Sequence, residues 1–420
     1  MVLTDEQLML LEQLAYIHDA GAPLGDLNGS MVNRSVADIV NCFGDEELAD
    51  MENQSESGAE WAAIIRAVKS DDELMSLQPA EHQTTVDEGV FCYRYTTESG
   101  MDRAVVVFAG TRTGEEWVDN FEGLNVADTS QQREALAVID SLPYDSISVV
   151  GHSKGGNKAQ YVTLLSDKVD QCLSMDGQGF SQEFLDKYWP EIQAKGTIIK
   201  NYSLSNDFVN ILLFPVPGSE QRYYDGGRNP GGMNHSPEKF FVFEEDESGH
   251  MQIKLGEDGK PILIETKQSD VMSYLHDFTC FIVTNGTEKD KKVLIQSLGP
   301  FVALLRSNTY RYELNGKVYT QENALQFLAS DMDSFALAIA YFVKYVDVNG
   351  FSNDQIIEFL TEMGMADPQI VNLINERQTA ISNDIRRSEE KQASDGLFYG
   401  KITLADGTKI DFNKKVTHDI

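Results

Sequence analysis

One segment constrains the fold of this 420-residue chain more than any other, the run SISVVGHSKGGNKAQY. Its first half is short, β-branched and apolar, which is typical of a strand buried on both faces, and its second half predicts a helix. Between the two lies a Gly-x-Ser-x-Gly pattern centred on Ser153. Glycines at such a turn remove Cβ atoms where the strand and the helix come close together. The segment therefore predicts a buried strand, a sharp turn and a helix.

The neighbouring segments repeat this alternation of strands and helices. Apolar or alternating runs predict further strands at Val90–Ser99, Met101–Gly110, Gln171–Met175 and Thr197–Leu204. Helical periodicity predicts helices at Thr129–Leu142 and Gly155–Ser166, and a helical arm from Thr4 to about Ala67. Strands that alternate with helices form parallel sheets with right-handed crossovers, so we expect an α/β fold with a mostly parallel sheet.

The second half of the chain has a different character. Phe214–Asn234 is rich in Gly and Pro and predicts a long loop, and Phe240–Leu263 predicts a hairpin with GEDGK as its turn. Apolar periodicity then predicts helices at Val293–Leu305, Ala324–Tyr345 and Gln355–Leu373, and the tail from Gly396 predicts one more hairpin. We therefore expect two parts: residues 1–268, an α/β domain with a helical N-terminal arm, and residues 269–420, a mostly helical region that forms a lid or docks a partner.

Composition narrows the classes of partner. The formal net charge of −33 argues against nucleic acid, which is bound by clustered Lys and Arg, and disfavours electrostatic adsorption to an anionic membrane. The four cysteines are far apart, without the spacing of a structural zinc site or a disulfide framework. No run of eighteen apolar residues and no cleavable leader occurs, so we expect a cytosolic protein or export by a leaderless route.

The placement of Ser153 is that of the nucleophile elbow of α/β hydrolases, which predicts that fold and a nucleophilic serine. In this fold a His follows the nucleophile in the chain as its base. His235 stands in the long loop soon after the last predicted parallel strand, and we expect it to be the base. His250 and His276 are placed where a structural role is expected, and His152 is adjacent to the serine.

Two carboxylates compete for the role of orienting that imidazole. Asp207 follows the last predicted parallel strand, and Asp176 follows the strand before it. Either could hold the ring and stabilise its charged form, and we favour Asp207. The expected oxyanion donors are the backbone N–H of Lys154, directly after the nucleophile, and that of Thr111, after an earlier strand.

Three runs in this order, FAGTRTGEEW, VVGHSKGGNKA and NDFVNILLFP, resemble those of the class 3 lipases. They are more similar to those of a group of lipase-like α/β hydrolases of Gram-positive bacteria, and the resemblance covers about Leu8 to Phe243. It implies a Ser153, Asp207 and His235 triad, with Thr111 and Lys154 at the oxyanion positions. The chain departs from class 3 lipases at Ala109, where Arg is common, and at Lys154, where Leu is usual.

We therefore expect an enzyme that cleaves small-molecule or lipid esters through an acyl-enzyme, without a metal or organic cofactor. Contact with a membrane stays open at this stage, because an apolar lid could reach lipid. The alternative is an interaction protein or secreted effector with a hydrolase-type scaffold, in which the C-terminal helices dock a protein partner.

Overall fold

The computed structural model describes residues 2–16, 34–80, 89–97, 99–110, 126–227, 234–287 and 289–293. It also describes shorter pieces between residues 300 and 357 and at 401–403 and 409–411. Within these ranges no helix is long and apolar enough to cross a membrane.

One sheet organises the described part of the chain. Its strands lie in the order β1, β2, β3, β4, β5, β6, β7, β10. The five from β3 to β7 are mutually parallel, and β1, β2 and β10 run antiparallel to their neighbours. The bounds are β1 (Gln78–Pro79), β2 (Val90–Thr96), β3 (Asp102–Phe108), β4 (Ile147–His152), β5 (Val169–Met175), β6 (Ile199–Leu204), β7 (Glu220–Tyr224) and β10 (Glu265–Thr266). The architecture is α/β with a mostly parallel sheet.

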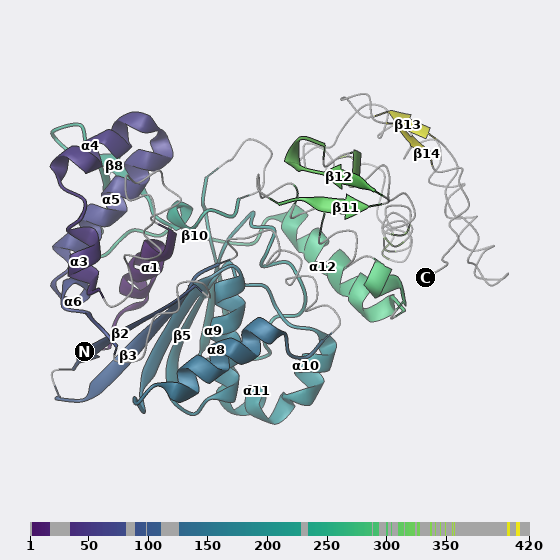
Figure 1. Cartoon of the computed structure of the whole chain (residues 1–420), viewed down its shortest axis with the longest axis horizontal. Helices are drawn as coiled ribbons and strands as arrows, with labels where there is room; N and C mark the ends of the chain where they lie inside the picture. The colour runs from purple at the N-terminus through teal and green to yellow at the C-terminus, as the bar shows by residue number, and fades with distance from the viewer. Residues whose placement is uncertain are drawn as a thin grey trace.

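Helices cover both faces of this sheet (Figure 1). The strand order from β3 to β6 follows the chain, so right-handed crossovers place the connecting helices on one face. These are α8 (Ser130–Ser141), α9 (Lys154–Leu165), α10 (Gln182–Lys187), α11 (Trp189–Lys195) and the short η2 (Gly196–Ile198). The N-terminal arm covers the other face, with α1 (Asp5–Gln13), η1 (Leu14–Tyr16), α3 (Val36–Val40), α4 (Asp45–Gln54), α5 (Glu56–Ser70) and α6 (Asp72–Met75).

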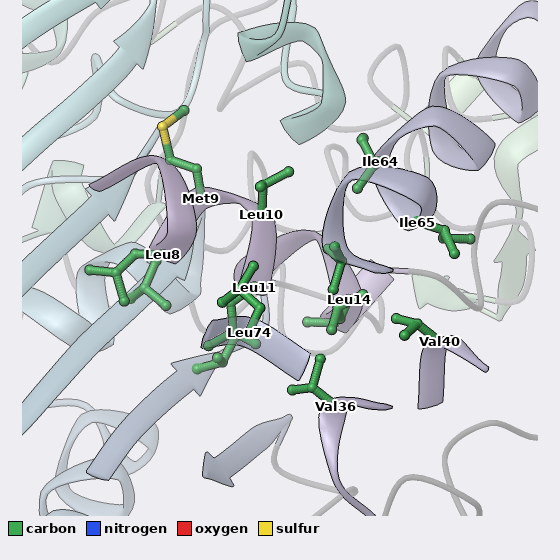
Figure 2. Close-up of a cluster of buried hydrophobic side chains, with 14 of the residues drawn as sticks. Leu8, Met9, Leu10, Leu11, Leu14, Val36, Val40, Ile64, Ile65 and Leu74 are labelled. Carbon is green, nitrogen blue, oxygen red and sulfur yellow. The ribbon is translucent and has the colours of Figure 1, made fainter. Parts of the chain in front are cut away.

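The strands alternate between two hydrophobic cores. In β3, Val105 and Val107 face the arm, while Val106 and Phe108 face α8 to α11. Figure 2 shows the arm side, where apolar side chains from α1, η1, α3, α5 and α6 come together. A strand buried on both faces carries a nearly continuous apolar run, here Ala104–Phe108 in β3 and Val149-Val150 in β4, which is why both strands were evident in the sequence.

The arm begins with a well-formed helix. Thr4 accepts a hydrogen bond from the N–H of Gln7, and the Gln7 side chain accepts one from the N–H of Thr4, which completes a capping box. Helix α1 then packs on β3, β4 and β5 and against α5. The short helix η1 follows α1 directly, and its last residue, Tyr16, reaches the carboxyl ends of the parallel strands.

Two details of the predicted loop and hairpin are wrong. The stretch Phe214–Asn234 contains β7, which pairs in parallel with β6, so the sheet has one more strand before His235 than the sequence predicted. The hairpin that follows, β8 (Phe243–Glu245) with β9 (Met251–Ile253), turns at residues 246–250. GEDGK closes a second, smaller turn bounded by a single bridge between Leu255 and Pro261.

Beyond residue 268 the described elements mix helix and strand. Helix α12 (Asp270–Asn285) is followed by a hairpin of β11 (Tyr312–Leu314) and β12 (Lys317–Tyr319) and by the short η4 (Gln321–Asn323). No hairpin was expected here, although the Asn-Gly pair at 315–316, which separates the two strands in the sequence, is a strong signal for one. A second hairpin, β13 (Lys401–Thr403) with β14 (Lys409–Asp411), lies in the tail where one was expected. Much of the predicted helical stretches lies outside the described residues, including nearly all of Gln355–Leu373.

Candidate active site

The site is built around the turn between β4 and α9. Ser153 has a φ of 60° and a ψ of −124°, a conformation that L-residues rarely adopt. Such strain costs on the order of 1–3 kcal/mol and is tolerated where the surrounding structure enforces it. The turn holds Ser153 at the carboxyl end of β4, at the edge where the parallel strands end.

Glycines enforce this turn by allowing the close approach of backbone segments. A Cβ on Gly155 would lie 1.8 Å from the carbonyl oxygen of Phe108, and one on Gly151 would lie 2.4 Å from the backbone of Gly155. Both distances are far inside van der Waals contact, so neither position accepts a larger residue. The Gly-x-Ser-x-Gly pattern is therefore a packing requirement between β3, β4 and α9.

His235 lies against the serine on one side and against a carboxylate on the other. Its Nε2 is 2.8 Å from Oγ of Ser153, and its Nδ1 is 2.5 Å from Oδ2 of Asp207. Asp207 is held in turn at Oδ1 by the backbone N–H groups of Val209 (2.9 Å) and Asn210 (2.6 Å). These donors favour the ionised carboxylate.

The loops that carry Asp207 and His235 are joined at their bases. Asp207 and Asn234 form a parallel β-bridge, and the N–H of Asn234 donates to the carbonyl of Asn206 (3.1 Å). The bridge brings His235, which is 28 positions after Asp207 in the chain, beside that carboxylate. Asp207, and not Asp176, is thus the carboxylate in contact with the imidazole.

A second acid and histidine lie directly behind the first pair. His152 stacks on His235 with ring centroids 4.6 Å apart, and its Nε2 is 3.6 Å from Oδ2 of Asp176. Burial, together with the charge of Asp207, raises the pKa of Asp176 to about 7, and burial lowers the pKa of His152 to about 4. At neutral pH the His152 ring is uncharged, and Asp176 holds a proton far more readily than an ordinary aspartate.

Glu12 of α1 extends this buried group from the arm. The side chain is fully buried, and burial together with the charge of Asp176 raises its pKa well above the usual value, against the N–H of His152, which lowers it. Glu12 was not among the residues expected at the site. It is four residues after Leu8 and so lies on the apolar face of the predicted helix, and this position indicates a buried carboxylate.

The expected oxyanion donors are only partly within the described chain. Lys154 is the first residue of α9 and is buried, directly after the serine. Thr111 lies outside the described residues, but Gly110 before it lies at the serine, since a Cβ on Gly110 would be 3.1 Å from Cβ of Ser153.

Apolar surface near His235 comes from a residue that the sequence analysis missed. The ring of Phe208 is 5.1 Å from the His235 ring and packs against a cluster that joins the Asp207 loop to the C-terminal region. The buried members of this cluster are Val209, Leu304, Tyr310, Tyr319 and Phe327. Helix α12 is fixed on the same loop, because Nδ1 of His276 and Oγ1 of Thr279 both bond the carbonyl of Ile211.

Two aromatic residues of the stretch Phe214–Asn234 lie in the hydrophobic cores on the two faces of the sheet. Tyr224 packs in the core beneath the arm, against Tyr202 and Phe240, and Phe214 packs in the core on the opposite face of the sheet. They do not form one slot beside His235. The strand β7 accounts for this, because it fixes Tyr224 in the sheet.

Among the described residues, His152, Asp176 and His235 offer ligand atoms within 4.8 Å of one another. This is the arrangement in which a metal ion could be held. Both nitrogens of His235 are already directed at Ser153 and Asp207, so a metal here would have to displace one of those contacts.

Known proteins are similar to part of the chain. Residues 82–203 match the model of the Mbeg1-like family, a range that includes the elbow and Ser153 and ends before Asp207 and His235. No curated protein matches the chain. Among solved structures, the chain is similar to that of the M37 lipase, with 16% identity over 50% of this chain and 70% of that one and a TM-score of 0.28.

Proposed function

We propose that the protein is a serine hydrolase of the α/β-hydrolase class, related to lipases and esterases, that cleaves carboxylic esters. One observation carries this proposal: Ser153, His235 and Asp207 are linked by hydrogen bonds of 2.8 and 2.5 Å in the order that nucleophilic catalysis requires. The strained turn that presents Ser153 is a second feature of such nucleophiles. The three runs that resemble lipase-like hydrolases support the same reaction class.

The chemistry follows from the distances. Oγ of Ser153 attacks the ester carbonyl carbon while Nε2 of His235 takes the hydroxyl proton and then delivers it to the leaving alcohol. A water molecule next attacks the acyl-enzyme, with His235 again accepting and returning the proton. Asp207, held by two backbone N–H groups, fixes the ring and stabilises the imidazolium.

The oxyanion that forms on the carbonyl needs donors beside Ser153. The N–H of Lys154, at the start of α9, and that of Thr111, after Gly110, are the proposed donors. A helix N-terminus is a favourable place for developing negative charge because its first N–H groups have no partners within the helix.

The ester substrate is proposed to carry an apolar acyl group. Phe208 lies between the His235 ring and the cluster formed with the C-terminal region, so apolar surface is available directly beside the reacting atoms. The packing of Phe208 against this cluster supports the proposal that the region after residue 268 covers the acyl group.

A fluorophosphonate probe tests the proposal on the intact protein. The wild type should form one covalent adduct, located on Ser153 by peptide mass spectrometry, and Ser153→Ala and His235→Ala should abolish it. Ser166→Ala, which changes a buried serine at the other end of α9, is the matched control and should label as the wild type does. An adduct on another serine, or no adduct, would overturn the assignment.

A further inference from the structure

The N-terminal arm reaches the proposed catalytic site at two points. Nε2 of Gln13 donates to the carbonyl of Pro237 (2.9 Å), two residues after His235. Tyr16, at the end of η1, reaches the elbow itself. Both residues come from one continuous helical segment that is packed on the central strands β3, β4 and β5.

The Tyr16 hydroxyl joins two loops that are distant in the chain. Its oxygen accepts a hydrogen bond from the N–H of Gly110 (3.0 Å), and it shares a second one with Nδ1 of His152 (2.7 Å). Gly110 lies two residues after the end of β3, and His152 is the last residue of β4, directly before Ser153. One hydroxyl therefore connects the turn before Thr111 to the elbow that carries the serine.

The packing around Gly110 is too tight for that turn to move independently. A Cβ there would lie 2.0 Å from the Tyr16 oxygen and 3.0 Å from the carbonyl oxygen of His152. The Tyr16 ring also lies edge-on to the His152 ring, with centroids 5.4 Å apart. The hydroxyl thus occupies space that only a glycine at position 110 leaves open.

We propose that Tyr16 is a positioning residue that holds the backbone of Gly110 at the elbow, so that Ser153 keeps the geometry it needs to attack the ester. The inference rests on the proposed hydrolase function. It gives the N-terminal arm a role in the reaction, because Tyr16 acts on Ser153 through Gly110 and His152. Because the contact orients the nucleophile for the chemical step, its loss should slow that step and leave binding of the ester unchanged.

Tyr16→Phe removes only the hydroxyl. A displacement of about 1 Å at the reacting group can cost about 10²-fold in rate, so a nucleophile that is loosened but still in place should cost about tenfold. We expect kcat, and the rate of labelling by a fluorophosphonate, to fall by this factor with KM unchanged. Hydrogen exchange at the Gly110 amide, followed by mass spectrometry on the intact chain, should become faster, because that N–H loses its acceptor.

Tyr202→Phe is the matched control. Its hydroxyl also ties a sheet residue to α1, donating to Asp5 (2.7 Å) at the opposite end of the helix from Tyr16. It should change the melting temperature about as much as Tyr16→Phe does, with kcat and Gly110 exchange as in the wild type. Equal losses of kcat in both variants would show that the hydroxyls matter only for anchoring the helix, and would overturn the proposal.

The outcomes separate this inference from the function it rests on. If the wild type forms no adduct on Ser153, the hydrolase function fails and the positioning role fails with it. If the wild type reacts and Tyr16→Phe reacts at the same rate, the positioning role alone is overturned. A rise in KM at constant kcat would also overturn it, because that result would assign Tyr16 to substrate binding.

Discussion

Two acid and histidine pairs lie side by side at the carboxyl edge of the sheet, and their surroundings differ. His235 and Asp207 are in direct contact at 2.5 Å, while His152 and Asp176 are separated by 3.6 Å, beyond hydrogen-bond range. Both aspartates are completely buried, so burial alone does not distinguish them. The difference lies in what faces each carboxylate.

Asp207 receives two backbone N–H groups at one oxygen and the imidazole at the other. Asp176 receives one backbone N–H, from Leu204 (2.7 Å), and faces the negative charge of Asp207 and the buried Glu12. Two neighbouring buried negative charges disfavour each other, so the carboxylate that accepts more hydrogen bonds keeps its charge. The comparison indicates that backbone donors distinguish the pair that we propose for proton transfer from the pair beside it.

The largest expected effect comes from exchanging each carboxylate for its amide. Asp207→Asn should lower kcat by about 10⁴, because the amide no longer stabilises the imidazolium and favours the wrong tautomer. Asp176→Asn, the matched variant of the other pair, should lower kcat far less. Steady-state hydrolysis of p-nitrophenyl esters measures both. A reversed order of the two effects would move the acid role to Asp176.

A second prediction concerns the stability of the folded protein, which depends on the protonation of Asp176. The pKa of Asp176 is about 7 in the folded protein and 3.8 in a free side chain, so the folded state holds a proton that the unfolded chain releases. This contribution to stability is complete below pH 4 and is lost as the pH rises towards 7. At about 1.4 kcal/mol per pKa unit, the loss is on the order of 4 kcal/mol.

Asp176→Asn should remove that loss. Asn retains an acceptor for the N–H of Leu204 and tolerates the positive φ of 47° at this position. Urea unfolding at pH 4.5 and pH 8 should therefore show a gain in unfolding free energy for the variant at pH 8 and little difference at pH 4.5. A variant that loses stability at pH 8 would mean that Asp176 is charged and paired.

Local patterns in the sequence predicted much of this framework. The strands β3 to β6 and the helices α8 and α9 follow the predicted segments closely, because strands buried on both faces are rich in apolar residues and the elbow glycines are required by contacts below 2.5 Å. Strand β7 was missed because its sequence, EQRYY, is mostly polar and partly exposed. Its place in the sheet depends on pairing with β6 and β10, which no local pattern records.

The site was predictable only where chain order constrains it. Chain order favoured His235 and Asp207, and the structure brings His235 to Ser153 and Asp207 to His235. Their catalytic roles stay predictions. Tyr16 and Phe208 were not found, because their contacts with His152 and His235 depend on how the arm and the loop fold back on the sheet. A docking role for the C-terminal helices stays a prediction as well.

A third, smaller effect is expected at Phe208, whose ring lies beside the His235 ring. Phe208→Ala should lower kcat/KM for an octanoyl ester relative to an acetyl ester by roughly tenfold, since burying each acyl methylene is worth about 0.8 kcal/mol. Phe243→Ala, which changes a half-buried phenylalanine packed against the core beneath the arm, should leave the ratio unchanged. If the ratio is the same in both variants, Phe208 does not contact the acyl chain.

The smallest effect on activity is expected at Glu12, which lies in the buried group with Asp176 and His152. Burial, with the charge of Asp176, raises the pKa of this carboxyl, so its stabilising contribution is present below about pH 4.5, the unfolded value, and is lost as the pH rises. Glu12→Gln keeps the shape of the protonated acid and removes the titration. We expect unchanged kcat/KM, an unchanged melting temperature at pH 4 and a higher one at pH 8.

The matched control is Glu6→Gln, which changes a half-buried residue of the same helix that faces Lys260 and should give no such gain. A melting temperature for Glu12→Gln below that of the wild type at pH 8 would show that Glu12 is ionised in the folded protein, and the group behind the catalytic pair would then carry charge.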